Sequence, residues 1–367
     1  MTGSRFKCSL RLVDASVTIG APTSVIMDIA KTVSRIRFRR AGFLPLGSWG
    51  LNVYATHDHY LASVARLFEG TFQRTAPTRA QQVEACLYLV GCPPHSPAFD
   101  AVFRSAALPR SAEILVSETL GSGILRLSSW MLRTVIDSRT RPARILCFVR
   151  DQESHRYYFR HFVHAFFLKL MRVFDRFYLH ASGVHYRGRT SIFVGKRHAG
   201  KTTVGLRLAR EGARLLSDDH VVLKKRGNAL YASGCRDTAR ISWKTETFLW
   251  GEKGALEARP KSYGGLLKKE FRAGQYFDHV PYRDFELHTM FFVRRGERIR
   301  IEPLTKEAAI LKLLRSMEGA YPFHRREDYI DCLEYLRCVV EHRSLFDVEL
   351  GRDLRELDTL VDFLRNA

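Results

Sequence analysis

The sequence lacks the features that mark secreted, disulfide-bonded and zinc-binding proteins. Its 367 residues contain seven cysteines, an odd number, and no two of them stand in a C-x-x-C spacing. This pattern argues against a disulfide framework and a zinc site, and it favours free thiols in a reducing compartment. No apolar run follows the early basic residues, so we expect no signal peptide and a cytoplasmic location.

Long apolar runs are lacking as well. The most apolar stretch, residues 161–181, contains Lys169, Arg172, Asp175 and Arg176, and these charges make a membrane crossing costly. No membrane span is therefore predicted. An amphipathic helix with one buried face is the favoured interpretation, and a helix lying on a membrane surface is the alternative.

Acidic residues are few, with 38 against 59 Lys and Arg, which gives a net charge of +21. Such a chain attracts polyanions: nucleotides, nucleic acid, anionic lipid or acidic peptides. The basic residues are scattered in short clusters, however, and physiological salt screens charges over roughly 8 Å. We interpret the charge as a bias in the choice of partner, and a dedicated nucleic-acid-binding role is disfavoured.

Hydrophobic residues make up 46% of the chain, enough for a sizeable core, and we find neither internal repeats nor low-complexity segments. A mixed α/β (α+β) fold is predicted, with a strand-rich domain over residues 1–154 and a second domain over residues 155–367. The N-terminal strands are expected at Phe6–Leu12, Ser34–Phe38, Gly50–Ala55, Ala85–Val90, Glu113–Val116, Ile124–Leu127 and Ile145–Val149. His57, Asp58 and His59 resemble a metal-ligand cluster, although a surface turn after a strand is favoured.

The second domain is predicted to open with a helix over residues 155–177. Two strands, Tyr178–Val184 and Thr190–Val194, then precede a helix over Lys201–Arg210 that Gly212 ends in a left-handed cap. Further strands are expected at Ala213–Ser217, His220–Lys224, Thr289–Val293 and Ile299–Ile301. The C-terminus is predicted to be helical, over Lys306–Ser316, Arg326–Val340 and Leu354–Arg365.

The clearest motif is the segment GKRHAGKT, which matches the phosphate-loop pattern G-x4-G-K-[ST] between a β-rich run and a helical pattern. Its glycines allow a tight turn whose N–H groups form an anion nest at the positive end of the helix. We therefore predict that ATP and Mg²⁺ bind here, with Lys201 on the phosphates and the Thr202 hydroxyl on the metal. The predicted nucleotide-binding residues are Gly195, Lys196, Arg197, His198, Ala199, Gly200, Lys201, Thr202 and Thr203. A glycine turn that merely caps a helix is the alternative.

Two adjacent acids, Asp218 and Asp219, follow Lys201 after only seventeen residues. Ten helical residues run roughly 15 Å away from the phosphates, and a strand of five or six residues returns about 16–20 Å. The acids are therefore expected at the height of the bound phosphates. One of them can hold the metal while the other accepts a proton from an attacking hydroxyl. An Asx turn at the end of a strand is the alternative.

These segments, together with residues 179–182 (LHAS), 191–194 (SIFV) and 214–219 (RLLSDD), resemble the catalytic core of HPr kinase/phosphorylase. They also resemble related small kinases found with ribosomally made peptides, and the fold is similar to the nucleotide domain of phosphoenolpyruvate carboxykinase. The resemblance covers about residues 178–225. It implies an ATP-dependent kinase in which Asp218 is the base towards a serine hydroxyl, Asp219 supports the metal and His180 is the family's histidine before the loop. Without the resemblance, His180 would be interpreted as a core histidine.

The chain also departs from that family. Arg197 and His198 stand where serine and glycine are usual, so they either add phosphate contacts or strain the loop. The family's later acidic and arginine residues have no clear counterparts here. Lys268, Lys269 and Arg272 are candidates to supply transition-state charge, and a solvated basic loop is an equal alternative.

The resulting hypothesis is a kinase for a serine or threonine hydroxyl of a peptide or small protein, with an acidic acceptor favoured and a small molecule left open. A homo-oligomer is compatible with the sequence. One rival is an NTP hydrolase or phosphorylase of the same fold. The other is a nucleotide-sensing or nucleic-acid-binding regulator with little catalysis. An ABC-type ATPase is disfavoured because no LSGGQ-like segment is present.

Overall fold

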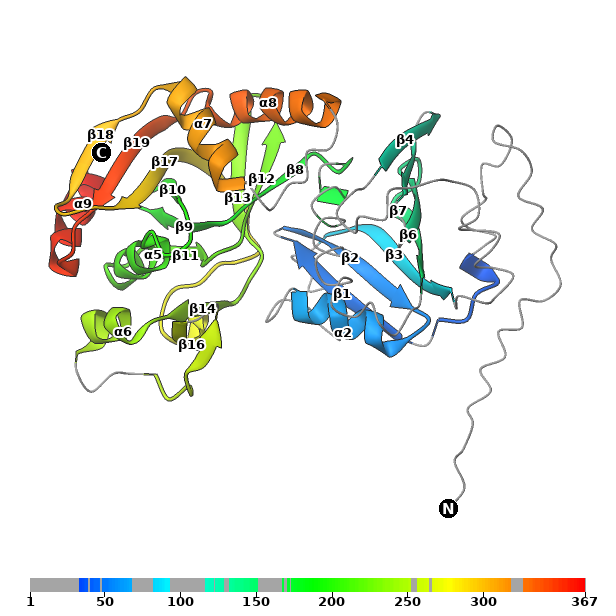
Figure 1. Ribbon diagram of the computed structural model, residues 1–367, viewed down its shortest axis with the longest axis horizontal. Helices are drawn as coiled ribbons and strands as arrows, with labels where there is room; N and C mark the ends of the chain where they lie inside the picture. Colours follow the sequence, from blue (N-terminus) through cyan, green and yellow to red (C-terminus); the bar gives the residue numbers. More distant parts are fainter. Residues whose placement is uncertain are drawn as a thin grey trace, which may run out of the picture. The chain divides into compact units, whose positions relative to one another are not determined.

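The computed structural model describes most of the chain from residue 33 onward (Figure 1). The described ranges are 33–38, 40–46, 48–67, 82–92, 116–121, 123–128, 132–150, 167, 170–171, 173–251, 256–263, 266–317 and 326–366. They divide into two compact units. One takes the described residues up to 41, residues 52–62 and the described residues between 84 and 157, and the other takes the rest.

The strands before residue 151 form a seven-stranded sheet in the order β1-β2-β3-β7-β6-β5-β4. Their bounds are β1 (Arg40–Leu46), β2 (Trp49–Ala55), β3 (Gln82–Cys92), β4 (Val116–Gly121), β5 (Ile124–Ser128), β6 (Leu132–Asp137) and β7 (Ala143–Arg150). Burial alternates along β6, as expected for a strand with one face towards a core. The helix α2 (Asp58–Leu67) follows β2.

A nine-stranded sheet carries the second half of the chain. Its main path runs β11-β9-β10-β17-β13-β12-β8, and β19 pairs with both β17 and β18. The bounds are β8 (Arg176–Leu179), β9 (Ala181–Tyr186), β10 (Arg189–Val194), β11 (Arg214–Ser217), β12 (Val221–Arg226), β13 (Ala229–Gly234), β17 (Phe285–Arg295), β18 (Arg300–Pro303) and β19 (Ser344–Leu350). β10, β17 and β19 run parallel to one another.

Both faces of this sheet are covered, and its central strands β10 and β17 contain the apolar runs Ile192–Val194 and Met290–Val293. On β10, Phe193 packs on one side with α5 (Lys201–Arg210) and α9 (Leu357–Asn366). Ile192 and Val194 pack on the other side with α7 (Lys306–Met317) and α8 (Arg326–Val340). Figure 1 shows α5 on one side of β10 and β17 and the pair α7 and α8 on the other.

A small three-stranded sheet lies beside α5. It has the order β14-β16-β15, with β14 (Thr238–Ile241), β15 (Lys261–Tyr263) and β16 (Leu266–Arg272). The short helix α6 (Trp243–Trp250) follows β14 and is capped by Ser242. Its Thr245 hydroxyl lies 3.1 Å from that of Thr203, which ties α6 to the start of α5. Two 3-10 turns, η2 (Ala273–Gln275) and η3 (Leu354–Glu356), complete the described elements.

The predicted fold class, a strand-rich mixed α/β chain with a helical C-terminus, is confirmed. Three local predictions were wrong. Ser34 is helical and Arg37 and Phe38 are irregular, where a strand was expected. The helix expected to reach residue 177 ends before β8 begins at Arg176. The single strand predicted over Tyr178–Val184 is two strands, because β8 pairs with β12 whereas β9 pairs with β10 and β11.

Some predictions fall outside the described residues. They are the strand at Phe6–Leu12, most of the strand at Glu113–Val116 and residues 155–166 of the expected helix. The domain boundary after residue 154 stays a prediction. In the described part of the chain, none of the helices has the length and apolar character needed to cross a membrane.

Candidate active site

The phosphate loop joins the end of β10 to the start of α5. Gly195 begins it, and a β-carbon there would lie 2.3 Å from the carbonyl oxygen of Val293, so only glycine lets β17 approach this closely. Gly200 ends it with a φ of 107°. His198 also has a positive φ, 67°, which costs a non-glycine residue about 1–2 kcal/mol. Backbone strain, one of the two alternatives for this position, is therefore present at His198.

Lys201, the first residue of α5, is buried beneath the loop. Its ammonium group donates to the carbonyl oxygens of Gly195 at 2.9 Å and Lys196 at 3.1 Å. Burial lowers the pKa of Lys201, while the charges of Asp219 and Asp218 oppose that effect. The side chains of Arg197 and His198 are exposed, so the cation at the centre of the loop is Lys201.

Strand pairing brings the acids to the same edge as the loop. β9 lies between β10 and β11 and is antiparallel to both, with Val194 opposite Ala181 and Ser217 opposite Gly183. β10 and β11 therefore end within two residues of each other along β9. The loop follows the first strand end and Asp218 follows the second.

Asp218 is 2% exposed, and both of its carboxylate oxygens are occupied. The Thr202 hydroxyl donates to Oδ1 at 2.6 Å, and the backbone N–H of Arg240 donates to Oδ2 at 3.1 Å. Burial, reinforced by the charge of Asp219, raises the pKa of Asp218 to about 7, although these two hydrogen bonds oppose the shift. A carboxyl with this proton affinity is suited to general base chemistry near neutral pH.

Asp219 stands beside His180 at the turn after β11. The His180 Nδ1 lies 3.2 Å from the Asp219 carbonyl oxygen, which can only accept, so Nδ1 carries the proton. Nε2 then faces the Asp219 carboxylate at 3.8 Å. Burial opposes ionisation of Asp219, but His180, His220 and Lys201 outweigh it and hold the pKa of Asp219 below its usual value. Burial also lowers the pKa of His180.

An arginine and glutamate cluster next to Asp218 was not predicted. Arg236 and Arg240 both contact Glu270 Oε2, at 2.7 and 2.5 Å, and Arg236 also donates to Thr238. Because β14 and β16 pair with Arg240 opposite Glu270, the cluster fixes the backbone N–H that binds Asp218. The alternation of Arg236, Thr238 and Arg240 is the signal that could have placed them on one face of a strand.

The three basic residues predicted to supply charge have different environments. Lys269 is bound to the buried Glu246 at 2.9 Å and to the Leu256 carbonyl at 2.9 Å, so it serves packing. Lys268 is half-buried, and its charge contributes to the lowered pKa values of His180 and Lys201. Arg272 is exposed. Only Lys268 is therefore close enough to the acids to influence their surroundings.

Two segments of the chain carry residues of the types that bind metal ions. Among the described residues, no group of three or more His, Cys, Asp or Glu side chains is arranged to hold a metal ion, and His57, Asp58 and His59 instead lie at the start of α2. Magnesium needs fewer protein ligands, because one or two carboxylates together with waters and substrate phosphates complete its coordination. Thr202 and Asp219, with Asp218 beside them, fit that pattern.

Comparison with known proteins adds little. No protein-family model matches the chain, and no curated protein matches it. Among solved structures, the chain is similar to "Structure of the Hpr(Ser) kinase/phosphatase from Coxiella burnetii", at 14% identity over 51% of this chain and 95% of that chain, with a TM-score of 0.27. Similarity at this level does not assign the chain to a family.

Proposed function

We propose that the chain is a phosphotransferase that moves the γ-phosphate of ATP to a serine or threonine hydroxyl of a peptide or small protein. The contact between Thr202 and Asp218, 2.6 Å between their oxygens, is the observation that carries the proposal. In a phosphate loop this hydroxyl binds the metal ion. The contact therefore places an acid that follows a different strand next to the metal-binding hydroxyl. A glycine turn that only caps a helix has no need of a buried acid at this place.

On the donor side, the N–H groups of the loop and the start of α5 would hold the β- and γ-phosphates. Lys201 would exchange its two carbonyl partners for phosphate oxygens. Magnesium would be held by Thr202 and Asp219 together with the phosphates, and it would neutralise charge on the transferred group. Asp219 suits this role because its pKa is held low, so it stays anionic.

On the acceptor side, Asp218 would take the proton of the attacking hydroxyl. The hydroxyl oxygen forms a bond to the γ-phosphorus, the bond between the γ-phosphorus and the bridging oxygen breaks, and ADP leaves. The raised pKa of Asp218 supports the role of base. Its burial means that the acceptor hydroxyl has to reach into the site beside Thr202.

The proposal is tested with ATP labelled in the γ-phosphate and a library of serine-containing peptides. We expect label transfer by the unaltered chain. Asp218→Asn should reduce transfer at least about a hundredfold, because general base catalysis contributes that much, while ATP binding persists. Lys201→Ala should weaken ATP binding itself.

Asp278→Asn is the matched control, because Asp278 is an exposed acid paired with Arg214. It should leave transfer unchanged. Release of free phosphate at the same rate with and without peptide would identify a hydrolase instead. ATP binding without either reaction would identify a nucleotide sensor.

A further inference from the structure

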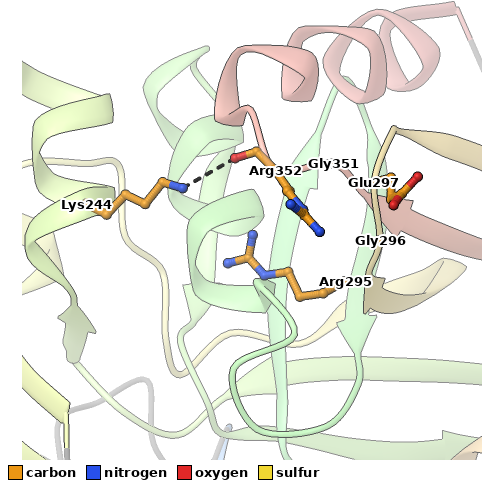
Figure 2. A pocket seen from close by; sticks show the side chains of 6 residues that line it. All are labelled: Lys244, Arg295, Gly296, Glu297, Gly351 and Arg352. Carbon is orange, nitrogen blue, oxygen red and sulfur yellow. Dashed lines mark hydrogen bonds between the residues drawn. The ribbon is translucent and has the colours of Figure 1, made fainter.

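A basic pocket lies next to the phosphate loop, and its lining contains none of the residues of the candidate active site. It has a volume of about 460 Å³ and is lined by Lys244, Arg295, Gly296, Glu297, Gly351 and Arg352 (Figure 2). This volume is within the range of small-molecule sites. The lining comes from three separate elements: the start of α6, the end of β17 and the residues after β19.

Cations outnumber acids in the lining of this pocket, with Lys244, Arg295 and Arg352 against Glu297. In Figure 2 the guanidinium groups of Arg295 and Arg352 point into the same space, while the carboxylate of Glu297 lies apart from them. The Lys244 ammonium donates to the Arg352 carbonyl oxygen at 3.3 Å. The charge of Lys244 also helps to lower the pKa of Asp353, and even with this acid counted the cations remain in excess. Because like charges repel, such a group favours an anionic occupant.

The pocket continues from the phosphate loop. Arg295 donates through Nε to the His198 carbonyl oxygen at 3.4 Å, and a β-carbon on Gly200 would lie 3.7 Å from the Arg295 guanidinium. β10, β17 and β19 are parallel, so the loop, Arg295 and Arg352 all lie at the carboxyl ends of strands at one edge. Ligands of open α/β sheets bind at that edge. One molecule can therefore occupy the loop and the pocket together.

We propose that this pocket receives the nucleoside and α-phosphate of the donor nucleotide whose β- and γ-phosphates occupy the loop. Arg352 is the main positioning residue, because its guanidinium can stack on the flat base. Lys244 adds charge from the opposite wall. The inference rests on the proposed function, since it assumes a nucleoside triphosphate in the loop.

The experiment compares two ligands that share a triphosphate and differ in the nucleoside. Binding of Mg·ATP and of Mg·tripolyphosphate to the full chain is measured by calorimetry for the unaltered protein, Arg352→Ala and Lys244→Ala. We expect Arg352→Ala to weaken ATP binding about tenfold, the effect of one cation–base contact, and to change tripolyphosphate binding by less than about twofold. Lys244→Ala should change ATP binding in the same direction.

Arg298→Ala is the control, because Arg298 is an exposed arginine on the same β17–β18 turn and does not line the pocket. It removes an equal charge and should leave both affinities unchanged. Equal losses for ATP and tripolyphosphate in Arg352→Ala would mean that the residue acts only through the general field, which overturns the inference. Unchanged ATP binding in Arg352→Ala would also overturn the inference. Neither result would contradict the kinase proposal. An unaltered chain that binds neither ligand overturns both.

Discussion

Asp218 combines good hydrogen bonding with an unfavourable charge. Thr202 and the Arg240 backbone satisfy both oxygens, yet the carboxyl is buried next to a second carboxylate, and its pKa is raised to about 7. In an unfolded chain the group would ionise near its ordinary value of 3.8. The fold therefore binds a proton that the unfolded chain releases between these two values. This residue lowers the free energy of unfolding as the pH rises through that window.

Asp218→Asn should therefore stabilise the ligand-free protein in a pH-dependent manner. The amide can accept from Arg240 and donate to Thr202, so both contacts persist. We expect the free energy of unfolding to rise by roughly 1–3 kcal/mol at pH 8, with a smaller gain at pH 5, where Asp218 is largely protonated. Chemical denaturation at the two pH values measures this. A gain that is equal at both pH values, or a loss at pH 8, would contradict the raised pKa.

At the scale of elements, local pattern predicted the parts of the site that lie along one continuous segment. The phosphate loop follows a short apolar strand and precedes a helix, and α5 was predicted with the observed bounds, Lys201–Arg210. The length of that helix and strand also placed Asp218 at the loop, where it contacts Thr202. A segment of about twenty residues is short enough that the position of its end can be calculated from the rise per residue of its helix and strand.

The features that the local sequence pattern did not predict depend on contacts between residues that are distant in the sequence. His180 separates β8 from β9 because the two strands pair with different neighbours, which the strand-like segment Tyr178–Val184 does not reveal by itself. The strand β14 has only four residues, and four of the seven residues of β16 are charged, so neither gives a clear strand pattern. Arg240 of β14 is paired with Glu270 of β16, thirty residues later in the sequence. The pocket beside the loop was missed for the same reason, since three separate elements form it.

Packing between elements gives a test at Gly195. Gly195→Ala would place a methyl group 2.3 Å from the Val293 carbonyl oxygen, so β10 and β17 would have to separate where the phosphate loop begins. We expect a loss of roughly 1–3 kcal/mol in the free energy of unfolding, as for other overpacked sites, together with weaker ATP binding. Gly274→Ala is the control, because the nearest atom to its β-carbon would be 3.9 Å away. Equal stability of the two variants would contradict this packing.

At the scale of the whole molecule, the net charge of +21 should act on the acceptor by its long-range field. Transfer is compared for two peptides with the same serine, one with acidic and one with basic flanking residues. We expect the acidic peptide to have a KM about tenfold lower at 50 mM salt, because its approach is favoured. At 500 mM salt the charges are screened beyond a few ångströms, so the difference should largely disappear. A difference that persists at 500 mM would place recognition in direct contacts, and a preference for the basic peptide would show that the net charge does not select the acceptor.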